Sequence, residues 1–372
     1  MCSVCRGSFD REYGAVNHAR LGFGGSDAPK VRRHVGREDP RRGGSPGDDG
    51  GRVREDADEV RTRIAALPAN EPHVLVGGYD IQPPFTRANP SFNLSGDDDA
   101  TILTDAPYAA TPGHSAEEFV PTRIVARIPD ATGSADAADF IKVLRFQAQA
   151  VTTPTPAKRF EECAAEFIEA ARVVATAMSS GTHRIVTSPP AKLAGAPDVV
   201  KRLAGAGRVH VLLHGANFSP DWAYLFGHHA DSADYPRAMS ARQIDLCDLR
   251  GAVVTFSSCY AAMLDSGDSE AARRSETNQV ALACLGHGAK VVVAATRSNW
   301  IALPPQPDGL GPGLVAEMWR QLAKGKKAGA ALRDARVAYV RKALSESSAS
   351  ERPYVLKTAL QMQIYGNPEA AL

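Results

Sequence analysis

Short apolar runs alternate with longer amphipathic stretches from about residue 70 to the end of the chain. The short runs are rich in β-branched residues and are bounded by glycine or polar residues, as in Val209–Leu213 and Ala252–Phe256. Runs of this kind are typical of parallel strands that helices cover on both faces. Between them lie stretches of helical character such as Glu276–Leu285. This alternation predicts an α/β fold around a mostly parallel sheet.

The same pattern predicts the order of the elements. Strands are expected at Val74–Val76, Ile124–Ile128, Arg184–Thr187, Val209–Leu213, Ala252–Phe256 and Lys290–Ala295. Helices are expected at Ala135–Ala150, Ala157–Met178, Asp198–Ala204, Glu276–Leu285, Gly313–Lys324 and Lys327–Leu344. The helix over Ala157–Met178 is inferred from apolar residues such as Phe160, Ala164 and Phe167, which are three or four positions apart.

Two reactive side chains follow neighbouring predicted strands. His214 and Gly215 come directly after Val209–Leu213, and Cys259 follows Ala252–Phe256 after two serines. Reactive groups in open α/β sheets lie just beyond the carboxyl ends of strands, so a base and a thiol are expected at one sheet edge. His214 precedes Cys259 by roughly the 50 residues that separate the corresponding pair in caspases. The N–H groups of Gly215 and Cys259 are candidates for an oxyanion hole.

These features resemble the cysteine peptidases that include caspases, gingipains and CHAT domains. The likeness to the gingipain type extends over residues 70–370 and includes, besides the two strand ends, four further segments: Pro72–Gly78, Thr104–Ala109, Pro121–Pro129 and Tyr365–Pro368. The resemblance implies a caspase-haemoglobinase-like three-layer αβα sandwich with a mostly parallel central sheet. It also implies a cysteine endopeptidase in which Cys259 and His214 form a dyad that works through a thioester acyl-enzyme.

The resemblance implies further site residues. Ser298, Asn299 and Trp300 follow the strand Lys290–Ala295 and correspond to a wall of the substrate pocket, and packing of Trp300 under the sheet edge is the alternative. Gingipain-type sites also contain an acidic residue that orients the histidine, and the sequence alone does not place it. Asp221 and Asp245 are near His214 in the chain, but nearness in sequence does not establish nearness in space.

Composition separates a tail from two expected subdomains. Arginine, glycine and aspartate dominate Arg32–Asp58, so there is too little apolar surface to offset the entropy cost of ordering that backbone. We expect residues 1–68 to be a disordered tail, residues 69–180 an N-terminal α/β subdomain and residues 181–372 a catalytic caspase-like α/β subdomain.

Charge and cysteine content limit the partners and the compartment. The net charge of +1 gives no electrostatic case for nucleic acid or an anionic membrane, and no apolar run reaches the length of a spanning helix. Six scattered cysteines without a signal peptide predict a cytoplasmic protein. The expected partners are a polypeptide substrate and a regulatory protein. We expect no cofactor and no metal site, although Asp97–Asp99 leaves open either a structural calcium or a solvated acidic loop.

Two other classes of function compete with the peptidase. The first is a catalytically silent, peptidase-like module that binds a partner protein without cutting it. The second is a nucleotide-binding α/β protein, suggested by the glycines in Gly286–Gly288 and Gly309–Gly313. Neither glycine cluster follows a strand and opens a helix as a dinucleotide-binding fingerprint does, so the sequence disfavours the second class.

Overall fold

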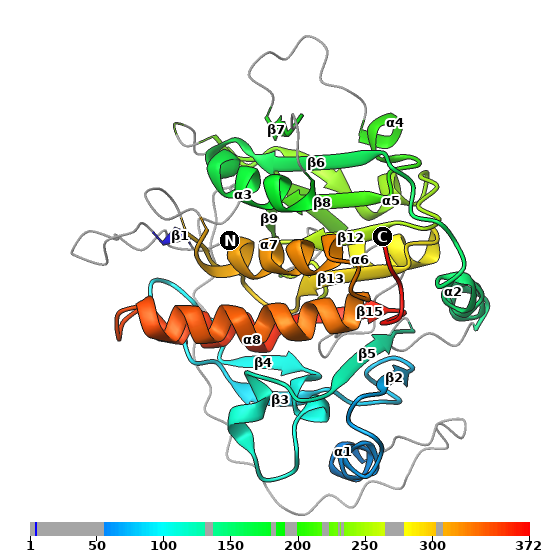
Figure 1. Ribbon diagram of the computed structural model, residues 1–372. Helices are drawn as coiled ribbons and strands as arrows, with labels where there is room; N and C mark the ends of the chain where they lie inside the picture. The colour runs from blue at the N-terminus through cyan, green and yellow to red at the C-terminus, as the bar shows by residue number, and fades with distance from the viewer. Residues whose placement is uncertain are drawn as a thin grey trace, which may run out of the picture.

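The fold is described from a computed structural model of the chain (Figure 1). The structure describes residues 56–130, 137–179, 184–189, 199–217, 223–229, 231, 234–264, 279–302 and 308–372, together with the pairing of strand β1 (Val4–Cys5) with β14 (Ile301–Ala302).

An eight-stranded sheet forms the centre of the molecule, in the order β2-β5-β15-β13-β12-β8-β6-β7 (Figure 1). Its strands are β2 (Pro72–Val76), β5 (Ile124–Ile128), β6 (Arg159–Ala164), β7 (Val186–Ser188), β8 (Arg208–Leu212), β12 (Val253–Phe256), β13 (Val291–Ala295) and β15 (Met362–Gly366). All neighbours are parallel except β13 and β15. The expected mostly parallel sheet is therefore confirmed.

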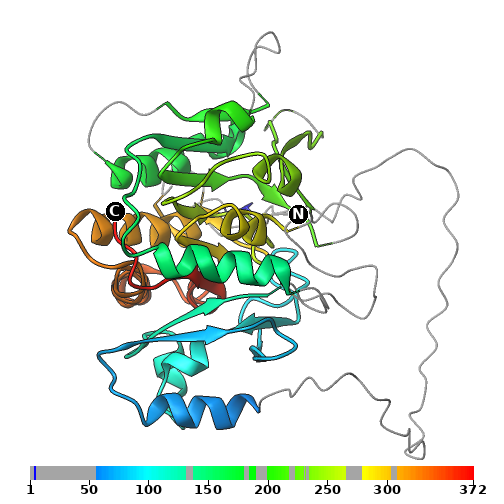
Figure 2. The ribbon, with the colours of Figure 1, turned by 90° about the vertical axis from the view of Figure 1, so that its right-hand side faces the viewer.

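Helices cover both faces of this sheet. They are α1 (Ala57–Ala65), α2 (Ala138–Gln149), α3 (Ile168–Met178), α4 (Val199–Leu203), α5 (Ala241–Ile244), α6 (Val280–Gly286), α7 (Leu310–Ala323), α8 (Ala328–Glu346) and α9 (Arg352–Gln361). Helices α3, α7 and α8 pack side by side on one face, and α2, α5 and α6 pack on the other (Figures 1 and 2). Within the described residues, no helix has the length and apolar character needed to cross a membrane.

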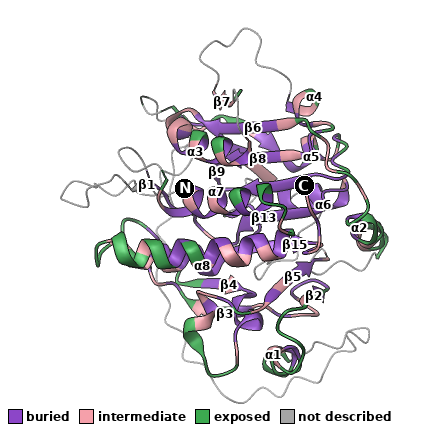
Figure 3. Cartoon of the chain, in the orientation of Figure 1, coloured by how far each residue is buried: buried purple, intermediate pink, exposed green. Residues whose placement is uncertain are grey.

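The central strands are buried on both sides, as their apolar sequences predict (Figure 3). Successive side chains of a strand point to opposite faces. In agreement, Val254 and Val292 belong to one hydrophobic cluster, whereas Val253 and Val293 belong to the other. Besides the β1–β14 pair, two smaller sheets pack beside the central sheet. They are β3 (Phe85–Ala88) with β4 (Thr101–Thr104), and β9 (His214–Gly215) with β10 (Tyr224–Phe226) and β11 (Arg237–Ser240).

Ordered structure begins before the end of the expected tail. The Asp56 side chain caps α1 by accepting hydrogen bonds from two main-chain N–H groups at 2.8 and 3.0 Å. Val60 and Ile64 lie one turn apart on this helix and are buried in a cluster with Leu75. Helix α1 therefore lies within the stretch expected to be a tail, and its two apolar positions at helical spacing dock it beside β2.

Strand β6 takes the place of the first part of the helix expected over Ala157–Met178. It lies between β7 and β8, where Glu162 is paired with Val186 and Val211. The expected subdomain boundary at residue 180 therefore falls between strands of one sheet. All residues of β6 after Arg159 are buried, and a short apolar run of this kind has no period that separates strand from helix.

Candidate functional site

His214 and Cys259 lie at matching positions beyond two adjacent parallel strands. Val211 in β8 is paired with Phe256 in β12, and the histidine and the cysteine each follow three residues later. Ser258 links the two strand ends, because its Oγ accepts a hydrogen bond at 3.1 Å from the N–H of the residue before His214. The structure thus brings the predicted base and the predicted thiol to one edge of the sheet.

Gly215 permits a close approach between these strand ends. A Cβ atom added to Gly215 would lie 1.8 Å from the carbonyl oxygen of Cys259, a distance that no pair of nonbonded atoms adopts. Only glycine fits at this position, so the residue fixes the main chain of the histidine against the main chain of the cysteine.

Glu166 is the acidic partner of His214 that the sequence could not place. Its Oε1 lies 2.6 Å from Nε2 of the imidazole. Because a carboxylate only accepts, Nε2 carries the proton and Nδ1 keeps its lone pair. Among the described residues, Nδ1 has no hydrogen-bond partner. Glu166 follows β6 by two residues, so it lies beyond the strand next to β8.

The charge state of this pair follows from its surroundings. Burial acts to raise the pKa of Glu166, but the hydrogen bond from His214 and the charges of His214 and His228 outweigh it, so this pKa is lowered. Burial lowers the pKa of His214 below its usual value, and Glu166 only partly offsets that effect. Near neutral pH the site therefore holds an ionised carboxylate beside a neutral imidazole that is able to accept a proton.

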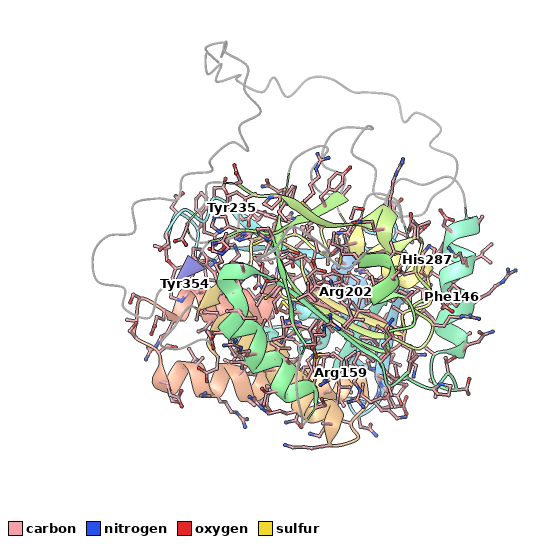
Figure 4. The ribbon with its side chains drawn as sticks, turned by 90° about the horizontal axis from the view of Figure 1, so that it is seen from above. Phe146, Arg159, Arg202, Tyr235, His287 and Tyr354 are labelled. Atoms are coloured by element: carbon pink, nitrogen blue, oxygen red, sulfur yellow. The ribbon has the colours of Figure 1, made fainter. Side chains whose placement is uncertain are left out.

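A second histidine shares the same carboxylate. Nδ1 of His228 lies 2.8 Å from Oε2 of Glu166. Tyr235 stacks on His228 with ring centroids 4.3 Å apart and meets His214 edge-on at 5.0 Å. Figure 4 shows Tyr235 on the same side of the molecule as Tyr354 and opposite His287. From the sequence, His228 and His229 are rivals of His214 as the base, but neither follows a predicted strand, so a solvated or structural role is favoured for both. The structure instead places His228 against the carboxylate that orients His214.

The Cys259 thiol is buried and its sulfur is hydrogen-bonded. Sγ lies 3.0 Å from the main-chain nitrogen of Asn299, whose N–H would stabilise a thiolate. The next residue, Tyr260, has a φ of 55°, a strained conformation for a residue with a side chain. Its N–H donates to the carbonyl of Arg297 and its hydroxyl donates to Asp99 at 3.1 Å. The loop that carries the thiol is therefore held in one strained conformation.

The three residues expected to bind substrate have other contacts in this structure. Ser298 donates its N–H and its hydroxyl to Asp99 at 2.9 and 2.7 Å, and the Asn299 side chain donates to the carbonyl of Ser257 at 2.9 Å. Trp300 is fully buried, with its ring edge-on to Tyr354. These contacts favour support of the Cys259 loop, and substrate contact by Ser298, Asn299 and Trp300 stays a prediction.

Two acidic residues considered as partners of His214 have different outcomes. Asp245 lies 3.5 Å from Nε2 of His287, and Figure 4 places His287 on the side of the molecule away from Tyr235. Asp221 lies outside the described residues. Of the acidic residues that the structure describes, Glu166 is the one that contacts His214.

The acidic segment Asp97–Asp99 surrounds a lysine ammonium group. Nζ of Lys357 lies 2.6 Å from Asp97 and 3.3 Å from Asp99, and it donates to the Ser298 hydroxyl at 2.6 Å. Burial acts to raise the pKa of Asp99, but Lys357 and the hydrogen bonds from Ser298 outweigh it, so this pKa is lowered. The ammonium group compensates both carboxylates, and a structural calcium ion at this segment stays a prediction.

Replacing Lys357 with methionine is expected to destabilise the protein by about 3–5 kcal/mol, because two buried carboxylates lose their counter-charge. The matched control is Lys342→Met. Lys342 is exposed and lies 3.3 Å from Asp308, so its loss is expected to cost less than about 1 kcal/mol. Urea unfolding of the three proteins measures the difference. Equal unfolding midpoints for the two variants would contradict the role of Lys357 as the counter-charge of the two buried carboxylates.

Comparison with solved structures identifies a known fold. The chain is similar to the Arg-specific cysteine proteinase gingipain R, with a TM-score of 0.57 and 11% identity over 85% of this chain and 68% of that one. It is similar to the complex of Porphyromonas gingivalis RgpB pro- and mature domains, with a TM-score of 0.56 and 11% identity over 85% and 70% of the two chains. A third structure, described as a protease, gives a TM-score of 0.58 and 10% identity over 87% and 71%.

These structural matches confirm the caspase-like gingipain fold that the sequence predicts. No protein-family model matches the sequence, and no curated protein is significantly similar to it. The expected likeness to CHAT domains has no support from these comparisons.

Proposed function

We propose that the chain is a cysteine endopeptidase in which Cys259 is the nucleophile, His214 the base and Glu166 the residue that orients the base. The observation that carries this proposal is the hydrogen bond between Glu166 and Nε2 of His214 beside the strand end that bears Cys259. A nucleophile, a base and a third group that orients the base form the arrangement that covalent acyl transfer requires. The gingipain-like fold supports the proposal.

The reaction proceeds through a thioester. His214 accepts the thiol proton at Nδ1, and Sγ of Cys259 attacks the peptide carbonyl carbon. As the carbon–nitrogen bond breaks, the imidazolium donates that proton to the leaving amine, and water then hydrolyses the thioester. Glu166 stabilises the imidazolium. The N–H groups of Gly215 and Cys259 donate hydrogen bonds to the oxyanion, and each donor stabilises the transition state by about 3 kcal/mol.

Access to the thiol is restricted in this structure. Cys259 is fully buried, so a peptide reaches Sγ only when the residues that cover it move. Regulation by a partner protein or by another part of the chain is consistent with this burial. One of the similar structures is a complex of pro- and mature domains. The catalytically silent binding module remains the alternative, and burial of the thiol is the observation that favours it.

The test is a panel of fluorogenic peptides with arginine, lysine, aspartate or leucine before the cleaved bond. Hydrolysis is expected for at least one peptide, and iodoacetamide is expected to stop it. Cys163 and Cys284 are as buried as Cys259, and burial raises their pKa values, that of Cys163 to about 12, so they serve as internal controls. Mass spectrometry is expected to find the alkyl group on Cys259. Hydrolysis that persists with Cys259 alkylated would refute the proposal.

A further inference from the structure

Glu166, His214 and His228 form a group with the donor set of a metal site. One ligand atom from each residue lies within 4.8 Å of the other two. The His214 side chain is 4% exposed, whereas the side chains of His228 and Glu166 are 11% and 12% exposed. An ion would therefore reach the group from the side of His228 and Glu166.

The chemistry of the group selects the kind of ion. Two imidazoles and one carboxylate suit Zn²⁺ and similar transition metals, whereas Ca²⁺ and Mg²⁺ prefer sets made of oxygen atoms alone. Two side chains at the sheet edge and one in a loop supply three ligands here, which leaves a fourth tetrahedral position for water. Three protein ligands with one open position differ from the four protein ligands of a structural zinc site.

The distances require only a small movement. Ring nitrogens of His214 and His228 now lie 2.6 and 2.8 Å from oxygens of Glu166. Tetrahedral ligands at bonds of about 2.0–2.1 Å are roughly 3.3 Å apart, so each nitrogen–oxygen distance must lengthen by less than about 1 Å. The ligand nitrogens of His214 and His228, which lie within 4.8 Å of each other, must also end about 3.3 Å apart. Tyr235 contacts both imidazoles and holds them side by side.

We propose that Glu166, His214 and His228 bind Zn²⁺ and that the bound ion inhibits the peptidase. The inhibition rests on the proposed function, whereas the metal site does not. Zinc would take the lone pair of Nε2 of His214, so the neutral ring would carry its proton on Nδ1. That nitrogen then cannot accept the proton of Cys259. The carboxylate of Glu166, bound to the ion, no longer stabilises an imidazolium. Metal binding therefore removes the base without altering the thiol.

The binding experiment uses the full chain with Cys259→Ala, which removes the thiolate as a competing ligand. Zn²⁺ affinity is measured by competition with a zinc-responsive dye. The Cys259→Ala protein is expected to bind one Zn²⁺, and addition of His228→Gln is expected to weaken binding by more than about tenfold, the lower end of the loss caused by removing even an outer partner of a metal site. Addition of His229→Gln, which alters the exposed neighbouring histidine, is expected to leave the affinity unchanged.

Two results would overturn the zinc site. The first is equal affinity with and without His228→Gln. The second is loss of Zn²⁺ binding in Cys259→Ala itself, which would place the ion on the thiolate. Because this measurement needs no turnover, it tests the metal site even if the chain hydrolyses no peptide.

The inhibition experiment then tests the switch on wild-type protein. Zn²⁺ is expected to inhibit peptide hydrolysis, EDTA to restore it, and Ca²⁺ at the same concentration to have no effect. Hydrolysis that continues with Zn²⁺ bound would show that the site holds the ion without controlling the enzyme, and would overturn the inhibitory role. Absence of hydrolysis at every condition would instead count against the proposed peptidase.

Discussion

Replacing Cys259 with alanine is expected to abolish peptide hydrolysis and to leave the fold intact. The sulfur is the atom that bonds to the substrate carbonyl, so its removal leaves only binding and oxyanion stabilisation. Loss of a covalent nucleophile lowers kcat by about 10⁴-fold or more, which places the variant below detection in a fluorogenic assay. The fold is expected to survive, because the change removes one side-chain atom and its hydrogen bonds with the main chain of Asn299.

The control for this substitution is Cys284→Ala. Cys284 is a buried cysteine of α6 that lies near Cys247 and Asp245, so its loss removes a similar volume without altering a residue of the proposed site. This control is expected to keep full activity per folded molecule. Circular dichroism and thermal unfolding of both variants report the fold. Residual hydrolysis by purified Cys259→Ala would exclude this thiol as the nucleophile.

The strand ends that carry the site were predictable because their sequences are unambiguous. The apolar run before His214 and the apolar run before Cys259 each form a central strand, within one residue of the expected bounds. A parallel sheet places the carboxyl ends of neighbouring strands together, so the approach of His214 to Cys259 follows from fold class alone. The close fit of Gly215 against Cys259 gives a structural reason for the glycine at that position.

The acidic partner was missed because its strand was missed. The sequence of β6 holds two buried glutamates, and its apolar residues also fit a helical period, so it was assigned to a helix. A carboxylate two residues beyond a strand end is the signal that would have identified Glu166, and it becomes visible only once β6 is placed. Helix α9 and strand β15 were also missed, because helix α9 is buried on much of its surface and lacks a clear apolar stripe.

Long-range polar contacts could not be predicted from the sequence. Lys357 lies far along the chain from Asp97, yet the two form a buried ion pair at 2.6 Å. No local pattern encodes such a partner, because the pairing depends on how α9 packs beside the loop between β3 and β4. The same holds for Trp300, whose burial against Tyr354 on α9 was one of two interpretations that the sequence left open.

Replacing Glu166 with glutamine is expected to lower kcat/KM by about 10²–10⁴-fold, because the amide no longer fixes the tautomer of His214 or stabilises its imidazolium. The control is Glu169→Gln, which alters a glutamate on the surface of α3 that pairs with Arg172. This control is expected to keep the wild-type rate. A purely structural role for Glu166 would instead lower the thermal unfolding temperature in proportion to the loss of activity.

The pH profile separates an orienting role from a structural one. Burial already lowers the pKa of His214, and the hydrogen bond and negative charge of Glu166 act in the opposite direction. Removing the carboxylate takes away the contribution that raises this pKa, so the pKa of His214 falls further. The limb of the kcat/KM profile that reports His214 is therefore expected to move to lower pH in Glu166→Gln and to stay in place in Glu169→Gln. An unmoved limb, with the rate reduced, would show that Glu166 acts on the fold and not on the base.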